Sequence, residues 1–62
     1  RDEYRDEALA VLSQAYNNAA IILYDNGRLE TAVEYLQEAV RINPGNQVAR
    51  ENLGLIRQGF TR

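Results

Sequence analysis

The side chains that most enzymes use for catalysis are missing from this chain of 62 residues. It has no His, no Cys and no Lys, so it lacks the usual general base, the thiol nucleophile and the amine that forms Schiff bases. Carboxylates remain, and Asp25 with a neighbouring Glu could serve as an acid–base pair. No feature of the sequence gathers these carboxylates into a pocket, and their spacing is not that of a calcium-binding loop. We therefore expect a protein that is not an enzyme and that has no cofactor and no metal site.

The charge balance argues against nucleic acids as partners, and the apolar runs are too short for direct insertion into a membrane. Seven Arg against nine Asp and Glu give a net charge of −2, without the basic stripe by which proteins displace counterions from nucleic acids. No apolar run approaches the roughly 20 residues that cross a bilayer, and the N-terminus lacks the layout of a signal peptide. The absence of cysteine fits both cytosol and export, so we assign no compartment beyond a slight preference for the cytoplasm. The remaining class of partner is another protein.

Two turn signals divide the chain into three predicted helices and no strand. The first is an Asp-Asn-Gly sequence, in which Gly27 can adopt the left-handed conformation without a penalty from Cβ. In the second, Pro44 cannot continue a helix and Asn46 is a good N-cap for the next one. We predict that Gly59 ends the third helix. The predicted helices cover residues 3–25, 29–42 and 47–58, and the short first loop makes the first two an antiparallel hairpin.

Apolar residues at steps of three and four give each predicted helix an inward face. In the first helix the predicted inward residues are Tyr4, Ala8, Val11, Leu12, Ala15, Ala19, Ile22 and Leu23, with Tyr16 beside them. In the second they are Leu29, Ala32, Val33, Leu36, Ala39 and Val40, and in the third Val48, Ala49, Leu53 and Ile56. The first helix has more apolar surface than one neighbour can cover. Either the third helix folds back onto it or another protein covers the rest, and we favour the second alternative.

Residues 13–46 resemble one complete tetratricopeptide repeat, a helix-turn-helix of about 34 residues. The resemblance is strongest in the second half of this stretch, which closes with Pro44. There the family's two small residues fall on Ala32 and Ala39, and its bulky residue falls on Leu36. The alanines allow two helices to approach closely, and the bulky residue fills the gap between them. The resemblance implies an all-α fold of the solenoid type.

Beyond residue 46 the third helix resembles the first helix of a second repeat. A shift by one repeat length, about 34 residues, brings Leu53 and Gly54 onto the repeat pattern. Arg50 and Arg57, in contrast, place charge where a further repeat would pack, which is typical of the capping helices of solenoids. The sequence therefore predicts one all-α domain. An N-terminal helix extension, a complete repeat and a capping helix cover residues 1–12, 13–46 and 47–62.

In this family the first helix of each repeat lines a concave groove that receives a peptide or a helix of a partner. The resemblance therefore implies a non-catalytic interaction module, an adaptor or scaffold used in the assembly of complexes. The groove residues that it implies are Gln14, Asn17, Asn18, Ile21, Tyr24, Glu51, Asn52 and Leu55, with Asp25 and Gln58 on the same face. Asn17 and Asn18 would hydrogen-bond a peptide backbone, and the apolar members would contact its side chains. Because the chain has no lysine, we do not expect the grip on a C-terminal carboxylate that some members use.

Other interpretations stay open at this point. The groove residues could cover an internal surface or face water instead. The chain could also be a small structural or accessory subunit packed permanently in a larger complex, including one at a membrane surface, since a core this small contributes little stability.

Two charged segments also allow two interpretations. They are the opening residues 1–7 and the acidic line formed by Glu30, Glu34 and Glu38. Each is either a solvated face or a docking segment, and we favour solvated faces.

Overall fold

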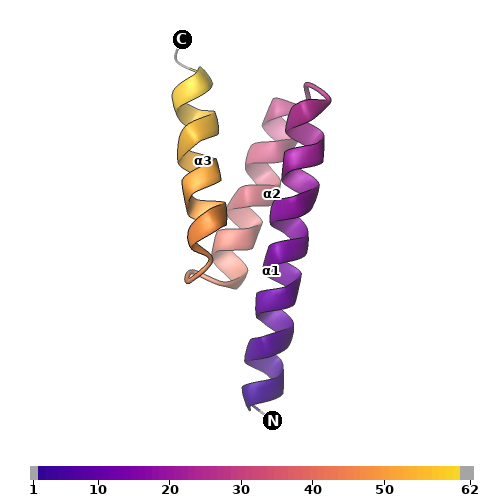
Figure 1. Cartoon of the computed structure of the whole chain (residues 1–62), viewed down its shortest axis with the longest axis vertical. Helices are drawn as coiled ribbons and strands as arrows, with labels where there is room; N and C mark the ends of the chain where they lie inside the picture. Colours follow the sequence, from indigo (N-terminus) through magenta and orange to yellow (C-terminus); the bar gives the residue numbers. More distant parts are fainter. Residues whose placement is uncertain (1, 61–62) are drawn as a thin grey trace.

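The computed structural model describes residues 2–60 and, among their side chains, those of residues 4–59. It contains three helices, α1 (Asp2–Asp25), α2 (Leu29–Ile42) and α3 (Gln47–Phe60), and the described residues form no strand. α1 and α2 form an antiparallel hairpin, and α3 runs back along α2 in the same direction as α1 (Figure 1). The predicted all-α fold is confirmed. The predicted end of the third helix was wrong, because Gly59 keeps a helical backbone: glycine permits a helix to end but does not force it to.

The turn between α1 and α2 ends the first helix as predicted. Gly27 has a φ of 79°, the left-handed conformation that residues with a Cβ rarely adopt. The N–H groups of Gly27 and Arg28 then donate to the carbonyl oxygens of Tyr24 (3.0 Å) and Leu23 (2.9 Å), respectively. This pair of bonds is the Schellman pattern, which satisfies carbonyl groups that lack a partner at the end of a helix. The turn reverses the chain and sets α2 beside α1.

The turn between α2 and α3 starts the third helix with an asparagine cap, also as predicted. Oδ1 of Asn46 accepts the N–H of Ala49 at 3.1 Å, the bond expected of an N-cap residue. Oδ1 of Asn43 accepts the N–H of Gly45 at 3.1 Å within the same turn. The amide of Asn46 also reaches α1, where its Nδ2 donates to Oγ of Ser13 at 2.8 Å. One side chain therefore both begins α3 and ties it to α1.

The core is small and consists mainly of alanines. The buried apolar residues are Ala20 of α1, Ala32, Leu36 and Ala39 of α2, and Ala49 and Ile56 of α3. Half-buried residues surround them, and among these the rings of Tyr16 and Tyr35 meet edge to face with their centroids 5.4 Å apart. Because alanines occupy the helix crossings, the helices can approach closely and leave room for few large side chains. Among the described side chains, Leu36 is the largest that is fully buried.

The inward face predicted for the first helix was largely wrong. Val11 and Ile22, expected inside, are 67% and 62% exposed, and Tyr4 is 67% exposed. The face of α1 that is buried instead carries two polar residues, Ser13 (0% exposed) and Asn17 (1%). The other buried or half-buried positions of α1 are Leu9, Tyr16, Ala19, Ala20 and Leu23, of which Ala19, Leu23 and the adjacent Tyr16 had been placed correctly.

Hydrogen bonds across the helices explain this rotation of α1. Oγ of Ser13 donates to the carbonyl oxygen of Ala39 at 2.7 Å and accepts the amide of Asn46. Oδ1 of Asn17 accepts Nδ2 of Asn52 at 3.0 Å. Polar groups satisfied in this way can be buried at little cost. A count of apolar residues along one helix scores these positions as outward, because their partners lie 26 to 35 residues away.

Two smaller expectations also differ from the structure. Leu29 and Val48 were expected inside but are 36% and 50% exposed. Each lies at the first turn of its helix, where fewer neighbouring side chains surround it. In Figure 1 the N-terminal turns of α1 extend past the ends of α2 and α3, and the side chains of residues 4–8 are exposed. Within residues 2–60 we find no helix with the length and apolar character needed to cross a membrane.

Candidate protein-binding groove

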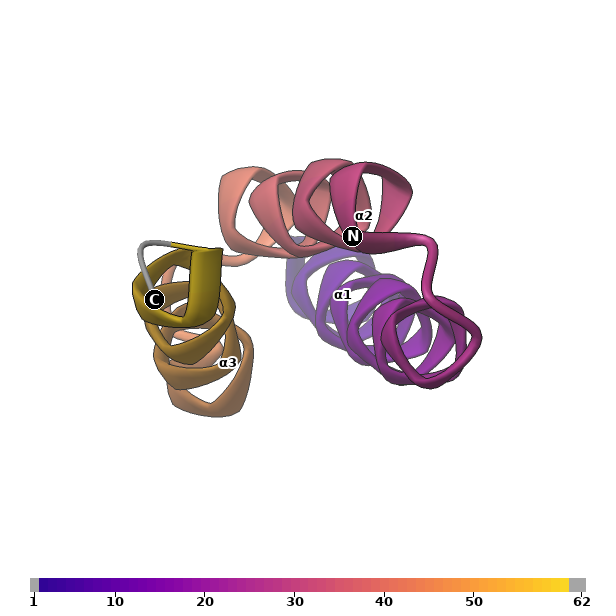
Figure 2. The same cartoon turned by 90° about the horizontal axis from the view of Figure 1, so that it is seen from above.

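The three helices leave a hollow on one side of α2. In Figure 2, α1 and α3 lie on the same side of α2, and α2 packs against both while α1 and α3 make few direct contacts. The hollow has a volume of about 250 Å³. Its lining comes from all three helices: Ile21, Tyr24, Leu36, Asn52, Leu55 and Ile56. We call this hollow the groove.

The groove has a buried floor and an exposed apolar rim. Leu36 and Ile56 are 0% and 9% exposed and belong to the core, so the floor is held by the fold itself. On the rim, Ile21, Tyr24 and Leu55 are 42%, 45% and 65% exposed. Pockets that hold small molecules usually exceed about 300 Å³ and enclose their ligand. A groove of this size is better suited to one or two side chains of another protein.

The polar wall of the groove is held by the pair of amides on α1 and α3. Asn17 is 1% exposed, and its Oδ1 accepts Nδ2 of Asn52, which is half-buried. The structure therefore gives Asn17 an internal role: it fixes Asn52 and holds α3 against α1. The expectation that Asn17 bonds a peptide backbone does not fit its burial. Asn52 keeps its carbonyl oxygen and a second N–H, because an amide carries two donors and an acceptor.

The structure brings four of the expected groove residues together, and these are Ile21, Tyr24, Asn52 and Leu55. The others lie outside the lining. Nε2 of Gln14 donates to Oδ1 of Asn18 at 3.3 Å on the exposed surface of α1, and Glu51 and Asp25 are exposed. Sequence reasoning missed the floor, Leu36 and Ile56, as groove residues. Both had been assigned to the core, and a residue that is at once core and groove floor gives no separate signal in a single sequence.

The lining of the groove carries no charged side chain. None of the arginines with a described side chain lines it. Arg41 pairs with Glu38 on α2, the guanidinium of Arg50 donates to the carbonyl oxygen of Pro44 at 3.3 Å, and Arg57 lines a separate hollow between α2 and α3. In the first of these pairs, the hydrogen bond from Arg41 lowers the pKa of Glu38 below its ordinary value. No cation within residues 4–59 is therefore placed to hold a carboxylate in the groove.

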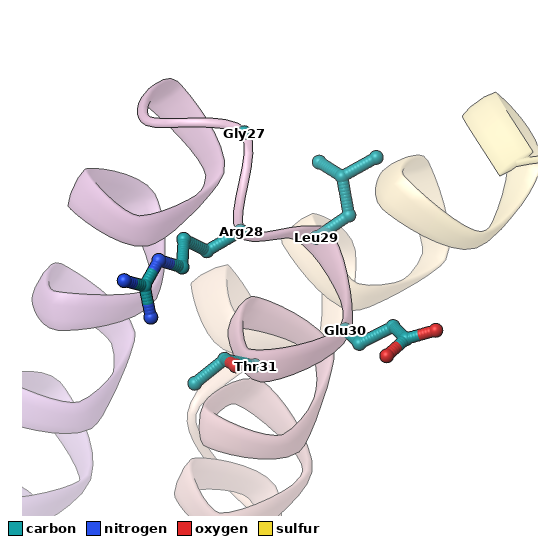
Figure 3. A pocket seen from close by; sticks show the side chains of 5 residues that line it. All are labelled: Gly27, Arg28, Leu29, Glu30 and Thr31. Carbon is teal, nitrogen blue, oxygen red and sulfur yellow. The ribbon is translucent and has the colours of Figure 1, made fainter.

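Two further observations concern other kinds of site. A wide depression of about 510 Å³ lies at the turn between α1 and α2. Figure 3 shows that its side chains diverge, with Arg28 and Thr31 pointing to one side and Leu29 and Glu30 to the other, so no groups converge on a ligand. Within the described residues no three His, Cys, Asp or Glu side chains gather where they could hold a metal ion.

Comparison with known families shows to which family the chain belongs. A family model described as the tetratricopeptide repeat matches residues 13–46, which is more than half of the chain. The chain belongs to the tetratricopeptide-repeat family. The first and last residues of the matched repeat, Ser13 and Asn46, are the two that hydrogen-bond each other between α1 and the start of α3. No curated protein and no solved structure matches the chain. Tetratricopeptide repeats generally mediate protein–protein interaction and are generally non-catalytic.

Proposed function

We propose that this tetratricopeptide-repeat protein binds a peptide or a helix of another protein through the groove between α1 and α3. The observation that carries the proposal is a rim of exposed apolar side chains, Ile21, Tyr24 and Leu55, around a floor that the fold already holds in place. Exposed apolar groups that converge on a hollow favour a partner, because a bound side chain removes them from water. A pre-formed floor also reduces the ordering cost of binding.

The chemistry of the lining defines what the segment must carry. A bulky aliphatic or aromatic side chain would fill the groove over Leu36 and Ile56 and contact the ring of Tyr24. The free donor and acceptor of Asn52 can bond the backbone of the segment beside that anchor. Since a single groove of this size supports an interface at or below about 1,200 Å², we expect weak, reversible binding.

The experiment is a selection followed by mapping. Peptides selected from a random displayed library on the purified chain are titrated into isotopically labelled protein, and the amide shifts are followed by NMR. The proposal predicts that the largest shifts fall on residues 21, 24, 52, 55 and their neighbours. Selection of no binder, or shifts confined to other surfaces such as the outer side of α1, would show that the groove is not the binding site.

A further inference from the structure

A second hollow lies between α2 and α3, on the opposite side of α3 from the groove. It has a volume of about 330 Å³. Its lining consists of Val40 on α2 and Arg50, Leu53, Gly54 and Arg57 on α3. Leu55 lines the groove and Arg57 lines this hollow, and residues two positions apart on a helix point about 200° apart. We call it the α2–α3 hollow, and an occupant there leaves the groove open.

The corresponding face of α1 is covered by a helix. A shift by one repeat length, about 34 residues, relates positions on α1 to positions on α3. It relates Ala20, which is 0% exposed in the core, to Gly54. It also relates Tyr16, whose ring meets that of Tyr35 on α2, to Arg50. The side of α3 that lines the hollow therefore corresponds to the side of α1 that packs against α2, and the occupant that fits it is a helix.

Gly54 has no role that the described part of the chain explains. A glycine within a helix costs stability relative to alanine, because its backbone loses more freedom on folding. It is not needed for a left-handed turn, since Gly27 is the glycine with a positive φ within residues 2–60. Nor does a neighbour require it, because a Cβ at Gly54 would meet no atom within 4 Å. A glycine that lines an open hollow instead allows another backbone to approach closely.

Two arginines determine the charge of the helix that fits. Arg50 and Arg57 are exposed and lie two helical turns apart on one side of α3, about 10 Å along its axis. The guanidinium of Arg50 donates to the carbonyl oxygen of Pro44 and keeps further donors. Arg57 has no carboxylate partner within residues 4–59. A purely apolar helix would bury unpaired cations at high cost, whereas carboxylates at the same spacing would pair with both.

A second copy of the chain is a poor source for this helix. The exposed side of α2 carries Glu30 and Glu34. Beside them on the helix lie Gln37 and Arg41, so this side offers carboxylates but no small or aliphatic stripe. It could meet the arginines of the hollow but could not cover its apolar lining. The helix that fits must carry both features.

We propose that the α2–α3 hollow receives an acidic amphipathic helix of another protein. Small and aliphatic side chains of this helix pack over Leu53 and Gly54, in the way that α2 packs over α1. Carboxylates about two turns apart on the same helix pair with Arg50 and Arg57. Because this surface is separate from the groove, the protein has two docking surfaces that select segments of different chemistry.

The first test uses a displayed library of helical peptides selected on the whole chain. Each peptide has a stripe of Ala and Leu, and the positions beside the stripe vary among Asp, Glu, Asn, Gln, Lys and Arg. We expect the selected peptides to carry Asp or Glu two turns apart. Their affinity, measured by fluorescence anisotropy, should fall at least about tenfold when Arg50→Gln and Arg57→Gln are combined, and it should fall with added salt.

The matched control removes the same charge elsewhere. Arg5→Gln combined with Arg28→Gln should change the affinity less than about threefold, because neither residue lines the hollow. Equal losses for the two double variants would mean that charge attracts the peptides without a specific site, and this would overturn the proposal. So would selected peptides without an acidic preference. A dimer of the chain in sedimentation velocity that the Arg50 and Arg57 double variant abolishes would make a second copy the occupant and would overturn it as well.

The second test separates close approach from the stability of the fold. Gly54→Leu and Gly59→Leu make the same change at two glycines of α3, and a Cβ at either meets no atom within 4 Å. Neither change should lower the melting temperature, because leucine favours helix more than glycine does. Gly54→Leu should weaken the selected acidic peptide at least about tenfold, and Gly59→Leu should leave its affinity within about twofold. An unchanged affinity for Gly54→Leu would contradict the proposed docking of a helix.

Discussion

The two sides of α1 are buried and exposed in the opposite sense to their hydropathy. On the inner side, the polar residues Ser13 and Asn17 are buried. On the outer side, the apolar residues Val11 and Ile22 are more than half exposed. The inner residues are polar but have partners on the other helices, whereas the outer residues are apolar and have none within the described chain. A helix in a repeat is therefore oriented by which of its residues find partners across the fold.

The largest effect that would test this contrast comes from exchanging the character of the two sides. Ser13→Leu adds volume at a fully buried site and removes the acceptor of Asn46, so we expect a loss of roughly 3 kcal/mol in unfolding free energy, enough to unfold much of a small domain. Leu12→Ser on the outer side should change the stability of the monomer by less than about 1 kcal/mol. Urea titrations followed by circular dichroism at low protein concentration measure both. Equal losses for the two variants would remove the contrast.

An intermediate effect is expected where the inner side meets α3. Asn17→Ala removes the acceptor of Asn52 and should cost about 1–2 kcal/mol in unfolding free energy. Combined with Asn52→Ala in a double-mutant cycle, the two losses should be non-additive by at least about 0.5 kcal/mol. Additive losses would mean that this bond does not hold α3 in place. The matched control is Asn18→Ala, because Asn18 is exposed on the same helix and should have little effect.

The smallest expected effect on stability comes from the charged pair of Glu38 and Arg41, and its pH dependence distinguishes it from the neutral hydrogen bonds on the inner side of α1. The pKa of Glu38 is lowered by the hydrogen bond from Arg41, so this pair stabilises the fold above the ordinary glutamate pKa and stops doing so as pH falls through the lowered value. Glu38→Gln should therefore reduce stability slightly at pH 7 and not at pH 2. The Asn17→Ala loss should be the same at both values, because its groups are neutral. Melting curves of both variants at the two pH values decide this, and a pH-dependent Asn17→Ala loss would contradict it.

The sequence predicts those parts of the fold that depend on nearby residues. Gly27 and Asn46 act within their own turns, so the helix bounds around them follow from the chain itself. The inward face of α2 also follows, because Ala32, Leu36 and Ala39 lie on one side of a strongly amphipathic helix. The same holds for much of α3.

The remaining features depend on contacts between distant residues. The resemblance to the repeat family implied that Asn17 faces a binding partner. In the structure its side chain instead bonds Asn52, which lies 35 residues away in the sequence. The apolar half of the groove, Ile21, Tyr24 and Leu55, was predicted through the resemblance to the repeat family. Its floor became visible only once α2 and α3 were placed, because Leu36 and Ile56 serve the core and the groove together.

The most direct test of the account uses two adjacent isoleucines on opposite sides of the contrast. Ile21 lines the groove and Ile22 lies on the outer side of α1, so Ile21→Glu and Ile22→Glu make the same chemical change on different surfaces. The measurement is the affinity of one library-selected peptide for each variant, by fluorescence anisotropy. We predict that Ile21→Glu weakens binding at least about tenfold, or 1.4 kcal/mol, while Ile22→Glu leaves it within about twofold. If Ile22→Glu weakens binding as much as Ile21→Glu, or more, the groove is not the interaction site of this repeat.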